Sequence, residues 1–147
     1  MTTNSTNLNT PSLPKGPTAG PDPSSAARLA RAEGEHARIT ALIGKATEAF
    51  VRQASAAEVN AILLELSGYT LTHFREEEEI MRSADFPAFQ THKDEHDRLA
   101  AYVRGLLDMR SKQDALRCAL SALDHWLDAH IRIADTQFFN FLRRKPQ

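Results

Sequence analysis

Apolar residues recur every three or four positions over most of this 147-residue chain, from about Ser25 onwards. This spacing is typical of amphipathic α-helices, each of which buries one stripe of side chains. No segment alternates apolar and polar residues as a half-buried β-strand would. The pattern therefore predicts an all-α protein.

Breaks in the stripe divide this region into four helices. We expect the first helix over about Ser25–Arg52, and the second to open at a capping box formed by Ser55 and Glu58. The third helix is expected to start at Pro87, which suits a first helical position, and a polar break at residues 111–113 precedes the fourth. Short connections between such helices indicate an antiparallel up-down-up-down four-helix bundle.

Residues 1–24 differ from the rest of the chain because they are mostly Thr, Asn, Ser, Pro and Gly. Such a segment buries too little apolar surface to offset the entropy lost on ordering. We therefore predict a disordered N-terminal tail over 1–24 and a single helical domain over 25–147.

Net charge, hydrophobic content and cysteine content limit the partners and the cellular location that we expect for the protein. The net charge is −1, so no overall field draws the chain to nucleic acid or to an anionic membrane. No apolar run approaches the roughly 18 residues of a membrane span, and the N-terminus does not resemble a secretion signal. One cysteine allows no internal disulfide. We expect a cytoplasmic protein.

Polar residues occupy stripe positions that normally hold aliphatic side chains. Five of the six histidines lie on the stripes, together with one glutamate. Burying such groups without partners costs several kcal/mol each, so a shared metal centre is the simplest explanation. The candidate ligands are His36, His73, Glu77, His92, His96, His130 and Asp135.

The spacing of these residues supports a metal centre. Two pairs, beginning at His73 and at His92, are four residues apart, so each pair projects from one helix face. A third pair, His130 and Asp135, is five residues apart, wider than ideal but still within reach of one interior point. Five imidazoles and two carboxylates exceed the needs of one ion and suit two metals that share carboxylate bridges. Iron, copper, zinc and nickel all accept imidazole ligands.

Other interpretations explain fewer residues. The segment 92–96 matches H-x-x-E-H, an inverted zinc-peptidase motif, but a peptidase leaves the remaining core histidines unexplained. A ferritin-like site needs two E-x-x-H pairs, and only Glu33 with His36 fits that pattern. His125 lies off the stripe and is expected at the surface or beside the ligands. The neighbours of Glu77, at 76, 78 and 79, are interpreted as the solvated flank of the helix.

Three segments, in order, resemble the motifs of the haemerythrin family. Residues 73–81 resemble H-F-x-x-E-E-x-x-M, and residues 86–96 resemble Y/F-P-x-x-x-x-H-x-x-x-H. Residues 126–135 resemble W-L-x-x-H-I-x-x-x-D. The similarity covers roughly the last 120 residues of the chain.

This resemblance implies an oxo- or hydroxo-bridged, non-haem di-iron centre. It assigns His92, His96 and His130 to one iron, and His36 and His73 to the other. The carboxylates of Glu77 and Asp135 would bridge the two irons, together with an oxygen from solvent. The iron with two histidines keeps an open position for dioxygen. Residues that resemble the apolar oxygen pocket of the family are Ile39, Phe74, Trp126, Leu127 and Ile131.

The function implied by the resemblance is reversible dioxygen binding, for carriage, storage or sensing, and not catalysis. The alternative is a di-iron enzyme on the same scaffold that acts on peroxide or nitric oxide. A third hypothesis is a binding module whose metal reports iron or redox state to a protein partner. Dioxygen is the expected ligand, and the chain is expected to be a monomer.

Overall fold

The structure is a computed structural model that describes residues 23–109 and 111–145. Its helices are α1 (Pro23–Val51), α2 (Ala56–Ser83), α3 (Phe89–Asp108) and α4 (Gln113–His130), then a π-helical turn, η1 (Ile131–Asp135), and α5 (Thr136–Arg144). The described residues contain no strand, so the all-α prediction is confirmed. The predicted tail lies outside the described residues, apart from its last two, which begin α1.

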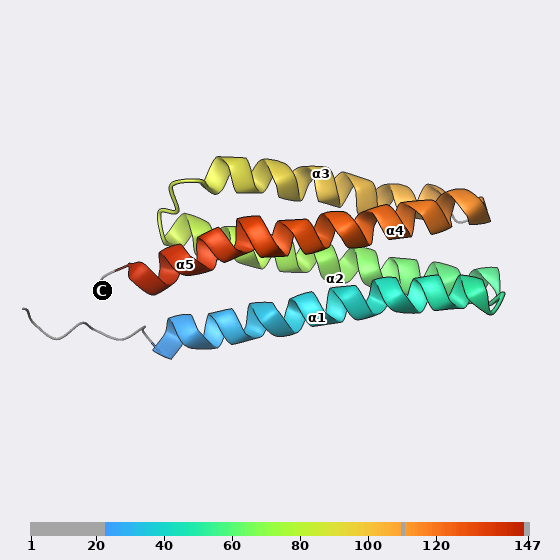
Figure 1. Ribbon diagram of the computed structural model, residues 1–147, viewed down its shortest axis with the longest axis horizontal. Helices are drawn as coiled ribbons and strands as arrows, with labels where there is room; N and C mark the ends of the chain where they lie inside the picture. Colours follow the sequence, from blue (N-terminus) through green and yellow to red (C-terminus); the bar gives the residue numbers. More distant parts are fainter. Residues whose placement is uncertain (1–22, 110, 146–147) are drawn as a thin grey trace, which may run out of the picture.

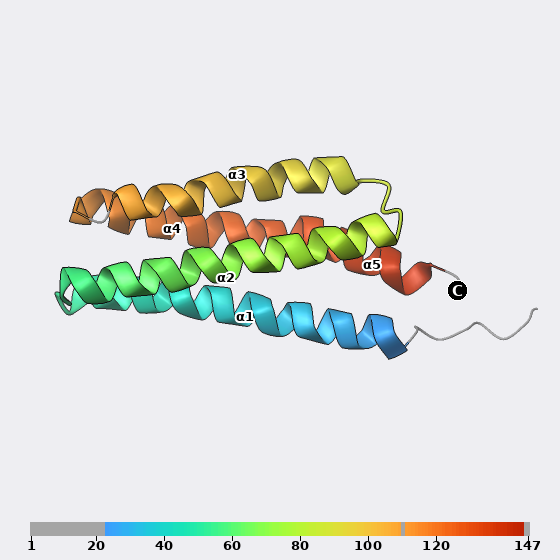
Figure 2. The same ribbon diagram turned by 180° about the vertical axis from the view of Figure 1, so that it is seen from behind.

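The helices form an antiparallel four-helix bundle, as predicted from the sequence (Figure 1). α1 and α3 each pack against both α2 and α4, so the four helices surround one core. α4, η1 and α5 continue one another as a single long rod, visible from both sides in Figures 1 and 2. The start of α1, the turn between α2 and α3, and the end of α5 lie at the same end of the bundle.

Local sequence signals account for one helix start but not for another. Ser55 caps α2, and its hydroxyl accepts a hydrogen bond from the Glu58 backbone N–H at 3.2 Å, which is one half of the predicted capping box. The Glu58 carboxylate binds Arg52 in place of the Ser55 backbone. The prediction that Pro87 occupies the first helical position is wrong, because α3 begins two residues later. Phe86 is buried against Phe138 and Phe141, which holds the chain across the end of the bundle before the helix starts.

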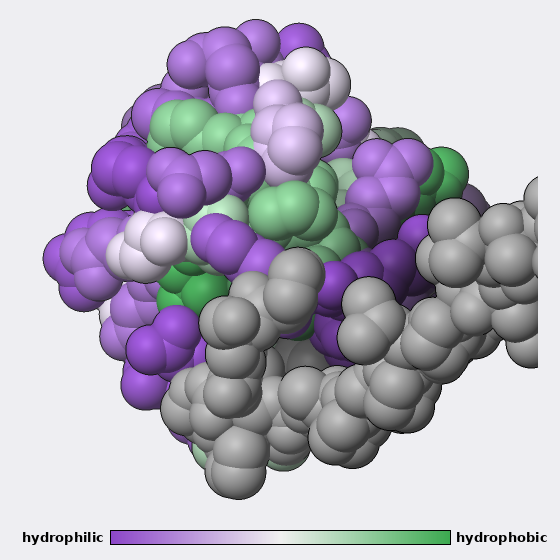
Figure 3. Space-filling view, turned by 90° about the vertical axis from the view of Figure 1, so that its left-hand side faces the viewer, coloured by the Kyte–Doolittle hydropathy of each residue, from purple (hydrophilic) through white to green (hydrophobic). Residues whose placement is uncertain are grey.

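Two hydrophobic clusters fill the bundle, with a layer of polar residues between them. The larger cluster contains Leu63, Leu99 and Leu120 and takes residues from α1 to α4. The smaller cluster lies towards the end where α5 stops and contains Met81 and Phe138. Figure 3 looks onto this end and shows hydrophobic residues between hydrophilic ones. No helix in the described ranges is long and apolar enough to cross a membrane.

Candidate metal centre

The structure brings all seven predicted ligands into the polar layer. Every helix of the bundle contributes, and each of these side chains is buried, with an exposed fraction of 7% or less. Their ligand atoms form two overlapping groups, and within each group the atoms lie within 4.8 Å of one another. The first group is Glu77, His92, His96, His130 and Asp135; the second is His36, His73 and Asp135.

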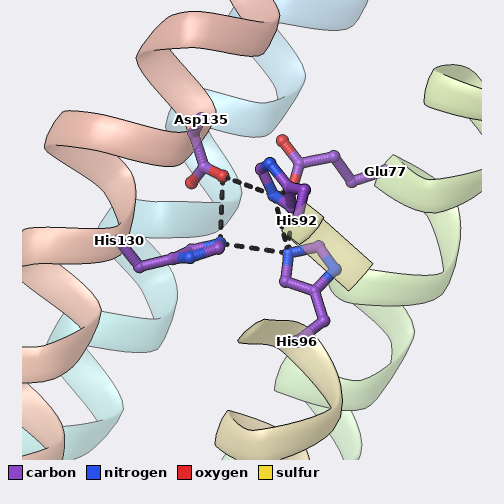
Figure 4. Close-up of side chains that lie close together, drawn as sticks. All are labelled: Glu77, His92, His96, His130 and Asp135. Carbon is purple, nitrogen blue, oxygen red and sulfur yellow. Dashed lines mark hydrogen bonds and ion pairs between the residues drawn. The ribbon is translucent and has the colours of Figure 1, made fainter. Parts of the chain in front are cut away.

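Three imidazoles of the first group point their Nε2 atoms at one another (Figure 4). The Nε2 atoms of His92 and His96 are 3.1 Å apart, as are those of His96 and His130. The rings of His96 and His130 each direct Nδ1 at a carboxylate, to which a neutral imidazole donates its only N–H. Their Nε2 atoms then present lone pairs to each other, an arrangement that a metal ion would stabilise.

The second group has only two imidazoles. The rings of His36 and His73 meet edge to face, with their centroids 4.8 Å apart. His36 Nε2 lies 3.0 Å from Asp135 Oδ2, and His73 Nε2 lies 3.9 Å from Glu77 Oε2. The number of imidazoles therefore differs between the two groups, three against two.

Both buried acids lie between the two groups. Asp135 directs Oδ1 at His92 and His130, 3.1 Å from each Nε2 atom, while its Oδ2 faces His36 in the other group. Glu77 Oε2 is 3.4 Å from His96 Nε2, in addition to its approach to His73. Asp135 thus directs one oxygen at each group, as a ligand shared by two metal ions does. Glu77 belongs to the first group and approaches the second through Oε2 alone.

The donor set fits a cation because its polar atoms lack other partners. Among the described residues, both carboxylate oxygens of Glu77, both of Asp135, and His36 Nε2 are buried without a hydrogen bond. Leaving such atoms unpaired in a protein interior costs free energy that metal coordination would remove. Imidazole nitrogens with carboxylate oxygens are ligands that first-row transition metals accept.

The two acids are negatively charged at neutral pH in spite of their burial. Burial raises the pKa of Asp135, but the neighbouring imidazoles, above all His130, outweigh it and hold that pKa well below its usual range. Burial also opposes ionisation of Glu77, yet His92 helps to lower the Glu77 pKa. In return, these carboxylates overcome the effect of burial on His92 and raise its pKa to about 9. Both acids are therefore ionised, as carboxylate ligands of a cation must be, and without metal the imidazoles beside them hold protons that a cation would replace.

Three glutamates outside the ligand set bind the outer nitrogens of three ligand histidines. His73 Nδ1 donates to Glu35 at 2.9 Å, and His130 Nδ1 donates to Glu95 at 2.8 Å. The third such bond is from His96 Nδ1 to Glu78, at 3.2 Å. A hydrogen bond of this kind fixes the tautomer and orientation of the ring, leaving Nε2 free to bind a metal.

These glutamates follow one rule around the bundle. Each is next in sequence to a ligand on its own helix and reaches a histidine on the following helix, from α1 to α2, from α2 to α3 and from α3 to α4. The sequence analysis missed Glu35 and Glu95, and it wrongly assigned Glu78 to the solvated flank. Adjacency to a ligand was the only sequence signal available for them.

The sequence predicted one regular fourth helix, but the structure divides it into α4, η1 and α5. The π-helical turn η1 widens the backbone after His130, and the Thr136 backbone N–H bonds the carbonyl of Ile131, five residues earlier. The Thr136 hydroxyl donates to the same carbonyl at 3.1 Å. This wider turn is what directs Asp135 into the core beside His130.

The residues predicted to form the oxygen pocket all belong to the larger hydrophobic cluster. Ile39, Phe74 and Leu127 are buried, whereas Trp126 and Ile131 are half-buried and pack against them. Phe74 stacks on the ring of a ligand, His96, with centroids 4.1 Å apart. By contrast His125 is exposed on α4 and bonds the Ser121 carbonyl, as expected for a residue outside the ligand set.

A cleft of about 400 Å³ opens on the side of the polar layer that lies opposite the predicted oxygen-pocket residues. Its walls come from α1, α2 and α5, and two candidate ligands, His73 and Glu77, line it. Glu35, which binds His73, lines it as well. Solvent therefore has a route to the two-imidazole group.

Comparisons with known proteins agree with this site. The sequence matches the family described as "Hemerythrin HHE cation binding domain" over residues 28–142. A Bacteriohemerythrin of Ralstonia nicotianae is 29% identical over 97 residues, covering 65% of this chain and 71% of that protein. A Bacteriohemerythrin of Stenotrophomonas maltophilia is 35% identical over 86 residues, 56% of this chain and 54% of that protein. No solved structure matches the chain at a significant level.

Proposed function

Because this chain belongs to the haemerythrin family, we propose that it binds dioxygen reversibly at two iron ions held in the polar layer of the bundle. The role would be carriage, storage or sensing of dioxygen. The ligands would be the seven buried residues of the two groups, with Glu77 and Asp135 shared between the ions.

The observation that carries this proposal is the unequal division of histidines. One group holds three imidazoles and the other two, while Asp135 belongs to both groups and Glu77 Oε2 of the first lies 3.9 Å from His73 Nε2 of the second. The two-imidazole ion would keep a position that no protein ligand fills. Such an open position separates a ligand-binding metal site from a purely structural one.

The surrounding residues would favour reversible binding. Two Fe(II) ions held by these residues would supply the two electrons that bound dioxygen accepts. Buried Ile39, Phe74 and Leu127 would limit the access of water to the centre, because they belong to the larger hydrophobic cluster on that side. The outer glutamates would hold the ligand rings in place, so that binding and release need little reorganisation.

Dioxygen uptake tests the proposal. The reduced, iron-loaded protein should take up one dioxygen per two iron ions in an oxygen-electrode titration and release it when the gas phase is replaced by argon. Uptake without release, or uptake unrelated to iron content, would contradict reversible binding at a di-iron centre.

A di-iron enzyme acting on peroxide or nitric oxide is the second candidate. The observation in its favour is the cleft, because it gives polar molecules access to His73 and Glu77. Sustained turnover of peroxide or nitric oxide, faster than free iron supports, would favour the enzyme. Stoichiometric, reversible dioxygen uptake with slow turnover of both compounds would favour the carrier.

A further inference from the structure

We propose that divalent metal ions enter and leave the centre through the cleft between α1, α2 and α5, and that Arg31 closes this route. The inference rests on the proposed function only in requiring that the seven residues bind metal. It adds a transit site for hydrated divalent cations outside the ligand set.

The cleft is the larger of two surface pockets, among the described residues, that reach candidate ligands; the other, of about 160 Å³, is lined by His96 alone of the seven. His73 and Glu77 line the cleft. Glu77 has an exposed fraction of only 3%, and neither of its carboxylate oxygens has a hydrogen-bond partner among the described residues. A buried carboxylate at the inner wall of a cleft, with imidazoles beside it and no hydrogen bond, gives a cation a favourable destination.

The charged residues that line the cleft favour cations over anions and neutral molecules. The cleft is lined by four acids, Glu35, Glu76, Glu77 and Glu79, and by two arginines, Arg28 and Arg31. The balance is negative, so the local field concentrates cations and repels anions. Dioxygen is neutral and gains nothing from this field, whereas a divalent metal ion gains twice what a monovalent ion does.

Arg31 lies where it can control this field. Its guanidinium binds Glu35 at 2.8 Å on α1 and also binds Glu76 on α2, so it joins two walls of the cleft. The single positive charge of Arg31 is shared between two of the acids that would attract a metal ion and offsets part of their charge. The Arg31 side chain is 65% exposed, and ion pairs at such positions are weak, so it can swing into solvent and open the route.

The rate of iron release tests this route. The reduced, iron-loaded protein is mixed anaerobically with an excess of a chelator that becomes coloured on binding Fe(II). Arg31→Gln should speed release roughly threefold or more, because the closing contacts and the repelling charge are lost. Ser83→Trp should slow release by a similar factor, because Ser83 is an exposed residue of the cleft wall and the larger side chain narrows it.

Two controls match these variants. Arg38 also joins α1 to α2, through Glu65 at 2.5 Å, but does not line the cleft, so Arg38→Gln should leave the release rate unchanged. Ser121→Trp places the same bulk on an exposed face of α4 and should also have no effect. Slower release in Ser83→Trp is the decisive result, since damage to a metal site makes release faster and not slower.

Other outcomes overturn the inference in distinct ways. Equal release rates in the parent, Arg31→Gln and Ser83→Trp would show that metal uses another route. Equal acceleration by Arg31→Gln and Arg38→Gln would show that loosening α1 from α2 matters and the cleft does not. A parent protein without iron would contradict the proposed function as well. A protein that binds two iron ions and dioxygen, but releases iron at unchanged rates, would contradict the route alone.

Discussion

His130 and Asp135 are five residues apart, yet His130 Nε2 and Asp135 Oδ1 lie 3.1 Å from each other. In a regular α-helix, residues five apart point about 140° away from each other around the axis. The π-helical turn over Ile131–Asp135 removes most of this angle and places both side chains on the inner face. π-turns of this kind occur frequently at functional sites, and here the turn supplies the acid that both ligand groups share.

Asp135→Asn should remove metal from the centre. The substitution preserves the size of the side chain but replaces the charged carboxylate that faces His92, His130 and His36. We expect iron content, measured by elemental analysis, to fall from two ions per chain to one or fewer.

Two controls accompany this variant. Asp128→Asn changes an exposed aspartate of α4 that pairs with Arg132, and it should retain two ions. His125→Ala should also retain two, since His125 is exposed and, among the described residues, its ring bonds the Ser121 carbonyl alone. Loss of an ion in His125→Ala would show that the ligand set is misassigned.

Glu95→Ala should weaken metal binding without removing a ligand. The change deletes the acceptor for His130 Nδ1, so the ring loses its fixed orientation and part of its basicity. Partners of this kind typically contribute about 10- to 100-fold to metal affinity. Competition with a chelator measures the change. Asp94→Ala removes an exposed acid next to Glu95 and should leave the affinity unchanged.

Much of the fold could be predicted from the sequence because periodicity and capping are local properties. Apolar spacing identified the four helices, and Ser55 with Glu58 marked the start of α2. The burial of the seven candidate ligands in one layer could be predicted because they occupy the apolar stripes of their helices.

The rest of the site depends on how the helices pack against one another, and local sequence patterns do not determine which side chains meet across two helices. Glu35 and Glu78 lie on half-buried helix flanks, where glutamate is common, and only the packing shows which histidine each one reaches. The spacing of His130 and Asp135 was the one local sign of the π-turn. The cleft arises from α1, α2 and α5 together and had no counterpart in any single segment.

Metal removal should destabilise the protein. Without metal, the buried oxygens of Glu77 and Asp135 have only the surrounding imidazoles beside them and no hydrogen bond, and the lone pairs of His96 and His130 face each other. A ligand that binds only the folded state, at about a hundred times its Kd, adds roughly 3 kcal/mol to the free energy of unfolding. Thermal unfolding followed by circular dichroism should therefore show a lower Tm for the metal-free protein. Equal Tm values with and without iron would contradict a centre that satisfies these atoms.

Phe74→Leu should shorten the life of the dioxygen-binding form. Phe74 is buried and stacks on His96, so a smaller side chain opens space beside a ligand and admits water. We expect a larger fraction of protein to be lost to irreversible oxidation in each cycle of air and argon. Leu116→Val makes a comparable packing change in the same cluster but near the start of α4, and it should lower stability without changing that fraction.

Optical absorption of the iron-loaded protein tests the central claim most directly. The account predicts two iron ions per chain and an iron(III) charge-transfer spectrum that appears in air, disappears under vacuum and returns with air over repeated cycles. A protein that carries a single zinc ion, or an iron-loaded protein whose spectrum is the same in air and under vacuum, would contradict it.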